Sequence, residues 1–167
     1  MAQRQPSTSG RSDLDRDEAT LRRYAAELAD AVERELPGWV ERSVERRLGP
    51  DLPPDVRHRS EAAGAQAAAD IGARVRQLLE MDIDVQWTNP LALLRAAVRY
   101  PAAVLDAAGA PRPVRDREAE RIHPEDRYDL SPAAFADVSP ELHEPGLVWG
   151  AAKAHVHLAR RRREGRL

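Results

Sequence analysis

The sequence contains no cysteine. A disulfide scaffold, a thiol nucleophile and a thiolate metal site are therefore excluded. Lysine is nearly absent as well, because Lys153 is the only one and every other cationic side chain is arginine. This bias is typical of a genome rich in G and C, so it predicts no function, although arginine suits bidentate contacts with carboxylate or phosphate.

Aromatic residues are also scarce, with three Trp, three Tyr and one Phe in 167 residues. Alanine, leucine and valine are the main apolar residues, and such small side chains bury little area each. They favour helices over strands. We therefore expect an all-α protein, a small irregular bundle of about six or seven helices.

Long apolar runs and catalytic motifs are missing. No run approaches the ~18 apolar residues of a membrane span, and the first residues lack the apolar core of a secretory signal. We therefore expect a cytoplasmic protein with no membrane partner. There is no glycine-rich phosphate loop, no G-x-S-x-G elbow and no HExxH motif. We expect no catalytic residue, no metal and no cofactor, and an enzyme whose site is not visible as a motif is the third hypothesis.

The length predicts one domain. Residues 1–12 are polar and are expected to form a disordered tail. Residues 13–163 are expected to form the single helical domain, and residues 164–167 a flexible end.

Apolar spacing predicts the helices of the first half. Pro37 and Gly38 divide a long amphipathic stretch, which predicts two helices, 14–36 and 38–48, that meet at a corner. A single bent helix is the alternative. A further helix is expected to begin between residues 54 and 60 and to end near Glu80. Its row of small residues, Gly64, Ala68 and Gly72, indicates either another helix packed very close or only an alanine-rich composition.

Capping residues followed by proline mark later helix starts at Asn89, Ser131 and Ser139. They predict a helix from residue 90 that breaks at Tyr100-Pro101 and two more helices at 132–137 and 140–163. Between residues 111 and 130 we expect a long loop with a short helix near 116–122. Residues 81–85 are expected to form an extended connector.

The three tryptophans all lie close to expected helix starts. We expect Trp39 and Trp87 to fill gaps in the alanine-rich core, with Trp87 folding back on the helix that follows it. Trp149 is the candidate anchor for a partner, because tryptophan and arginine are favoured at binding hot spots.

The loop "RIHPEDRYD" gathers His123, Glu125, Asp126 and Asp129. Together with Trp149 and the arginine cluster, these residues are the candidate partner-binding residues, while an acid–base pair or a divalent-ion site is a second hypothesis for the loop. The alternative is a polar turn in which Asp129 or Ser131 caps the next helix. His155 and His157 do not form a metal pair, because two residues along a helix place their rings on opposite sides.

Charge is divided unevenly near the C-terminus. Residues 111–145 hold nine acidic residues and five arginines, whereas residues 146–167 hold six basic residues against Glu164 alone. The basic group includes four consecutive arginines, Arg160, Arg161, Arg162 and Arg163. Three hypotheses compete for these arginines. They complement the helix dipole and neutralise the acidic stretch, or they bind the phosphates of a nucleic acid, or they dock an acidic protein.

These observations favour a non-enzymatic protein–protein interaction or adaptor protein. The expected partner is a protein, either a different one or a second copy of the chain. The alternative is weak association with nucleic acid through the arginine cluster, which is disfavoured because no aromatic residues lie among the arginines.

Overall fold

The computed structural model describes residues 8–81 and 89–165. The described residues are 78% helical and contain no strand, so the expected all-α bundle is confirmed. In chain order the helical segments are α1 (Thr8–Leu48), α2 (Pro54–Ala67), the π-helical η1 (Ala68–Gly72), α3 (Ala73–Met81), α4 (Pro90–Ala96), α5 (Arg99–Ala107), α6 (Arg117–Ile122), α7 (Phe135–Val138), the 3-10 helix η2 (Pro140–Leu142) and α8 (His143–Arg163).

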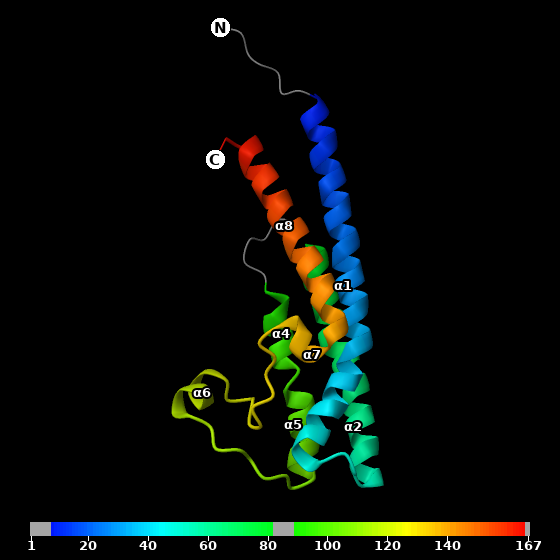
Figure 1. Cartoon of the computed structure of the whole chain (residues 1–167), viewed down its shortest axis with the longest axis vertical. Helices are drawn as coiled ribbons and strands as arrows, with labels where there is room; N and C mark the ends of the chain where they lie inside the picture. Colours follow the sequence, from blue (N-terminus) through cyan, green and yellow to red (C-terminus); the bar gives the residue numbers. More distant parts are fainter. Residues whose placement is uncertain (1–7, 82–88, 166–167) are drawn as a thin grey trace.

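Helix α1 runs the length of the molecule, and most of the other helices pack along it, whereas α6 stands away from it (Figure 1). The expected corner at Pro37 is wrong, because α1 continues through this residue as one helix. The alternative of a single bent helix is correct, since the axis of α1 changes direction in its lower, cyan part (Figure 1). Proline lacks the amide proton that would bond to the carbonyl of Glu33, which is a common cause of such a bend.

The apolar stripe of α1 drifts around the helix, and different neighbours cover it at different heights. Helix α8 packs on α1 from one side, whereas α2, α3 and α5 pack on it elsewhere. A single partner helix would leave part of this stripe in water, so several shorter helices are needed. Helix α1 also begins at Thr8, before the expected start near Asp13.

Segments α2, η1 and α3 form one helix with a π-helical turn in the middle. The row of small residues on it faces α1, as a closely packed helix requires. A Cβ atom on Gly64 would lie 2.9 Å from Cα of Pro37, and one on Gly72 would lie 2.6 Å from Cγ of Glu33. The backbones of the two helices therefore approach more closely than alanine at position 64 would permit.

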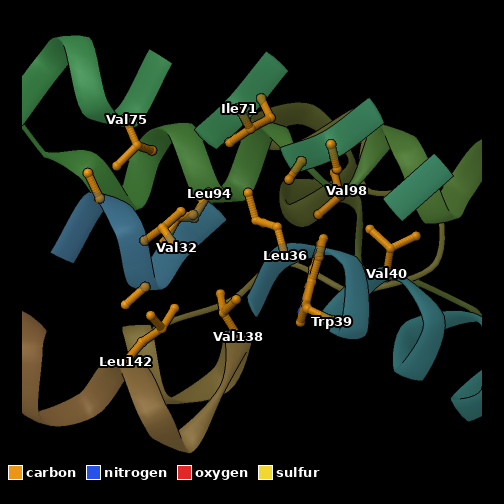
Figure 2. Close-up of a cluster of buried hydrophobic side chains, with 14 of the residues drawn as sticks. Val32, Leu36, Trp39, Val40, Ile71, Val75, Leu94, Val98, Val138 and Leu142 are labelled. Carbon is orange, nitrogen blue, oxygen red and sulfur yellow. The ribbon is translucent and has the colours of Figure 1, made fainter. Parts of the chain in front are cut away.

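The core lies around the middle of α1 (Figure 2). Trp39 is buried there, as expected, with 2% of its surface exposed. Side chains from every long segment meet in this cluster, which includes Val32, Leu36, Val40, Ile71, Val75, Leu94, Val98, Val138 and Leu142.

Helices α4 and α5 follow the cap at Asn89, whose side-chain oxygen accepts a hydrogen bond from the amide of Leu91 at 3.0 Å. The break between them lies at residues 97–98 rather than at the expected Tyr100-Pro101. Pro101 fits within the first turn of α5, where amide protons have no partner inside the helix. Gly109 ends the stretch with a φ of 67°, as its position predicts.

The segment from 110 to 138 contains two short helices. Asp116 caps α6 by accepting hydrogen bonds from the amides of Glu118 and Ala119 at 2.6 and 3.1 Å, close to the expected position. The expected helix at 132–137 is displaced, because α7 spans only Phe135–Val138. Ser131 does not begin it; instead the Asp137 carboxylate accepts hydrogen bonds from the amides of Ala133 and Ala134.

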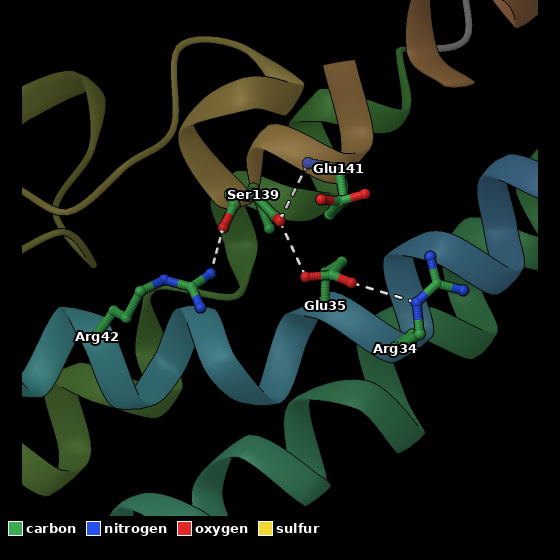
Figure 3. A network of polar contacts seen from close by, with 6 residues as sticks. Arg34, Glu35, Arg42, Ser139 and Glu141 are labelled. Carbon is green, nitrogen blue, oxygen red and sulfur yellow. Dashed lines mark hydrogen bonds and ion pairs between the residues drawn. The ribbon is translucent and has the colours of Figure 1, made fainter. Parts of the chain in front are cut away.

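The start of α8 is held against α1 by polar contacts (Figure 3). Ser139 accepts a hydrogen bond from the amide of Glu141 at 3.3 Å and donates one to Glu35 of α1 at 2.9 Å. Arg42 of α1 also donates to the carbonyl oxygen of Val138 at 2.8 Å. The helix expected at 140–163 is therefore present, begun by η2 and fixed to α1 at its first turn.

Several predictions lie outside the described residues. They concern the packing of Trp87, the connector after Met81, and the ends of the chain at 1–7 and 166–167. Met81 itself is the last residue of α3.

Candidate protein-binding surface

A cavity of about 330 Å³ lies between α4 and the segment that carries α6. It brings together three of the residues expected to form a site, His123, Glu125 and Asp126. Arg95 and Ser131 complete its polar wall, and the remaining lining is apolar, from Ala92, Ala96, Val98, Ile122 and Pro124.

Two of the polar groups of this cavity, Asp126 and Arg95, already serve the fold. Asp126 is 3% exposed, and its carboxylate accepts hydrogen bonds from the amides of Leu130 and Ser131 at 2.7 and 2.9 Å. Arg95 donates to the carbonyl oxygen of Pro132 at 3.1 Å. A carboxylate held by two amides closes the turn before residue 131, so Asp126 belongs to the polar turn of this loop. Neither Asp129 nor Ser131 caps α7, because the amides before that helix bond to Asp137.

Asp129 is not part of the cavity lining. It is exposed and has a φ of 56°, a left-handed conformation that aspartate tolerates better than most residues. Its place in the sequence is therefore explained by the turn.

A second cavity, of about 490 Å³, lies between α2 and α5. Its two arginines both face carboxylates, Arg59 contacting Asp55 and Arg99 contacting Asp70. Tyr100 donates a second hydrogen bond to Asp70 at 2.6 Å and, as the strongest influence, lowers the pKa of that carboxyl. With both cations engaged, this cavity is not a prepared anion site.

The basic end of α8 pairs with the acidic first half of α1. Arg160 donates to Glu18 through Nε at 2.8 Å and Nη2 at 2.6 Å. His155 Nε2 lies 3.0 Å from the carboxylate of Asp17. The acidic stretch around α6 lies toward the opposite end of the molecule from this pairing (Figure 1). Arg160 therefore acts within the fold, and the acids of α1 take the neutralising role expected of residues 111–145.

Trp149 is 8% exposed and belongs to the core cluster. The ammonium group of Lys153 lies 5.1 Å from the centre of its ring. The side chain is therefore covered within the chain, and the role of Trp149 as an anchor for a partner stays a prediction.

The opposite side of α8 carries apolar residues that face solvent. Leu147 and Leu158 are 61% and 44% exposed, and Ala151 and Ala154 between them are exposed as well. At ~100° per residue these four side chains lie on one line, roughly opposite Trp149 and Val156. We call this set the outer stripe of α8. Helix α8 therefore has two apolar faces, and the described residues cover only one of them.

Acidic and basic residues stand at the two ends of the outer stripe. Glu144 lies one turn before Leu147, and Arg162 lies one turn after Leu158, and both are exposed. This surface is not among the sequence predictions, which for α8 rested on Trp149 and the arginine cluster. The signal was present, since residues 147, 151, 154 and 158 repeat at intervals of four, three and four, which is typical of a helix-packing seam.

Neither a metal centre nor a membrane span is found among the described residues. No group of three or more His, Asp or Glu side chains there is placed to hold a metal ion. No helix in that part of the chain is both long enough and apolar enough to cross a membrane.

Comparison with protein-family models, curated proteins and solved structures finds no match.

Proposed function

We propose that the protein is a non-enzymatic protein–protein interaction module and that the outer stripe of α8 is its binding surface. The observation that carries the proposal is the second apolar face of α8. Surface leucines occur singly on many proteins, but an ordered row on a rigid helix is a preformed site for another helix.

The polar clusters of the chain support this reading over an enzyme. Asp126 is engaged by backbone amides, and Arg160 is engaged by Glu18. A catalytic acid or base needs a side chain directed at a substrate, whereas these side chains hold segments of the chain together.

The arginine cluster favours a protein partner over a nucleic acid for a related reason. Arg160 and His155 are paired with carboxylates of α1, so phosphates would meet acidic residues beside the arginines. Arg162 stands at the end of the apolar stripe, where it is placed to contact an acidic residue of a partner.

The test compares proteins that bind purified wild-type chain with those that bind the double variant Leu147→Asp/Leu158→Asp. Both leucines are exposed, so we expect the variant to keep its helical circular dichroism. We expect the wild-type chain to bind a partner in stoichiometric amount, whether another protein or a second copy, and the double variant to lose that binding.

The matched control is Val114→Asp, which makes the same kind of change at a fully exposed apolar residue outside the outer stripe. Its binding should equal that of the wild type. A partner retained equally by all three proteins would show that the outer stripe is not the binding surface.

A further inference from the structure

The outer stripe is self-complementary when two copies run in opposite directions. Along α8 its residues read Glu144, Leu147, Ala151, Ala154, Leu158 and Arg162. Reversing the helix exchanges acid for base at the ends and leaves leucine opposite leucine and alanine opposite alanine. A two-fold axis midway between Ala151 and Ala154 therefore places each leucine of one copy against a leucine of the other. It likewise places each alanine against an alanine and each glutamate against an arginine.

The geometry points to a second copy of this chain as the occupant: we infer that the protein forms a two-fold symmetric dimer through antiparallel α8 helices. This inference rests on the proposed function of the outer stripe. A two-fold interface uses the same patch on both subunits, which is what such a self-complementary row supplies.

The side chains suit close packing of two helices. The alanines at the centre have small side chains and let the helix axes approach, and the leucines on either side fill the space beyond them. Leu147 of one copy then packs on Leu158 of the other, twice per dimer by symmetry.

Charge determines the direction. In the antiparallel arrangement Glu144 of each copy lies level with Arg162 of the other. A parallel arrangement would instead place glutamate beside glutamate and arginine beside arginine. The basic last turn of α8, including Arg163, adds to the preference for the antiparallel pair.

The size of the interface sets the expected affinity. From Glu144 to Arg162 the stripe is about 27 Å long at ~1.5 Å per residue. Such a contact falls at the small end of specific interfaces, below ~1,200 Å² in total. We therefore expect a reversible dimer with a dissociation constant in the micromolar range.

Sedimentation velocity over a range of about 1 μM to 1 mM tests the dimer. Leu158→Asp should weaken dimerisation by about tenfold or more, because a carboxylate replaces the contact with Leu147. Val114→Asp should dimerise like the wild type. A chain that stays monomeric throughout, or a dimer unaffected by Leu158→Asp, would overturn the inference.

The absence of native cysteine allows the direction to be measured by disulfide trapping. A disulfide needs Cα atoms within about 7 Å. In the antiparallel dimer two copies of Leu158→Cys lie about 16 Å apart along the axis and do not crosslink. A mixture of Leu147→Cys and Leu158→Cys should crosslink rapidly. Crosslinking of Leu158→Cys with itself would indicate a parallel pair and contradict the proposal.

Charge reversal gives a second, independent readout. Glu144→Arg should weaken the dimer several-fold, because two arginines then face each other twice. Adding Arg162→Glu in the same chain should restore the affinity by exchanging the ends of the stripe. Failure of the second change to restore dimerisation counts against the antiparallel register.

The outcomes separate this inference from the proposed function. If the chain is monomeric while another protein loses its binding to Leu158→Asp, the inference fails and the proposed function stands. If neither a second copy nor another protein requires the outer stripe, both fail.

Discussion

Glycine at positions 64 and 72 sets the spacing between α1 and the α2–α3 helix. Glycine normally costs a helix about 1 kcal/mol relative to alanine, so its use here requires a compensating gain. The gain is the close contact with Pro37 and Glu33. The row of small residues was visible in the sequence, but only the structure distinguishes close packing from an alanine-rich composition.

Gly64→Ala should lower the free energy of unfolding by about 1–3 kcal/mol despite the better helix propensity of alanine. The new Cβ would meet backbone atoms of Pro37 at 2.9 and 3.0 Å, and backbone has little freedom to move aside. Urea denaturation followed by circular dichroism measures the change.

Gly150→Ala in α8 is the matched control, because nothing lies within 4 Å of its added Cβ. It should be neutral or stabilising by up to about 1 kcal/mol. Equal effects of the two substitutions would mean that α1 and α2 are not packed as described.

At the scale of elements, Asp106 fastens the long segment after residue 110 to α5. Its carboxylate accepts a hydrogen bond from the hydroxyl of Tyr128 at 2.8 Å and forms ion pairs with Arg127 and Arg112. Tyr128 is 1% exposed, so the loop carries a large buried ring of its own. The sequence predicts this segment as a loop but not its attachment, since Arg127 and Tyr128 lie more than twenty residues from Asp106.

This attachment should depend on pH. The hydrogen bond from Tyr128, reinforced by Arg127, lowers the pKa of Asp106 below its usual value near 3.8. The stabilisation is therefore present above pH ~4 and is lost as the pH falls through the lowered pKa. Burial raises the pKa of Tyr128 above 10, so its contribution is present below pH ~10 and is lost as the pH rises further.

The measurement is the difference in free energy of unfolding between wild type and Asp106→Asn. It should be about 1 kcal/mol near neutral pH, since the carboxylate is one-third exposed, and should shrink below pH ~4. Glu118→Gln, which alters a highly exposed ion pair with Arg121, should show no such difference. A difference that persists in acid would assign the effect to something other than the charge of Asp106.

At the scale of the whole molecule, helix content and most helix starts follow from local signals. Asn89 and Ser139 cap helices as expected, because a cap depends on neighbours within three residues. The continuity of α1 through Pro37 was not predictable in this way. It depends on helices packed against both parts of α1, which outweigh the local cost of proline.

The candidate site was predicted less well, for a physical reason. Charge and aromatic content suggested Trp149 and the arginine cluster, but their roles depend on which face of α8 meets α1. That face is set by contacts with residues far away in the sequence, such as Glu18. Only His123, Glu125 and Asp126 were found together at one cavity, as their proximity in the chain predicts.

Nucleic-acid binding should be weak or absent, because carboxylates of α1 lie beside the arginine cluster. Four to six independent phosphate contacts would give a salt slope of about −3 to −5 on duplex DNA. We expect no binding by micromolar protein at about 0.15 M salt in a fluorescence anisotropy titration.

The control for this titration is Arg162→Gln/Arg163→Gln, which removes cationic charge without touching the pair between Arg160 and Glu18. Tight binding with a steep salt slope that disappears in this variant would support the nucleic-acid alternative instead.

The pairing of α8 with the first half of α1 joins parts of the chain that are far apart, with 142 positions between Glu18 and Arg160. Closing so long a loop costs entropy that local contacts do not, so this pairing should form late in folding. The α1–α2 hairpin is local and should form earlier.

Substitutions at the α1–α8 contact should therefore speed unfolding and leave the folding rate nearly unchanged, whereas Gly64→Ala should slow folding. In a cell, the first three helices would leave the ribosome well before the helix that completes the fold, with the α8-facing side of α1 exposed until then.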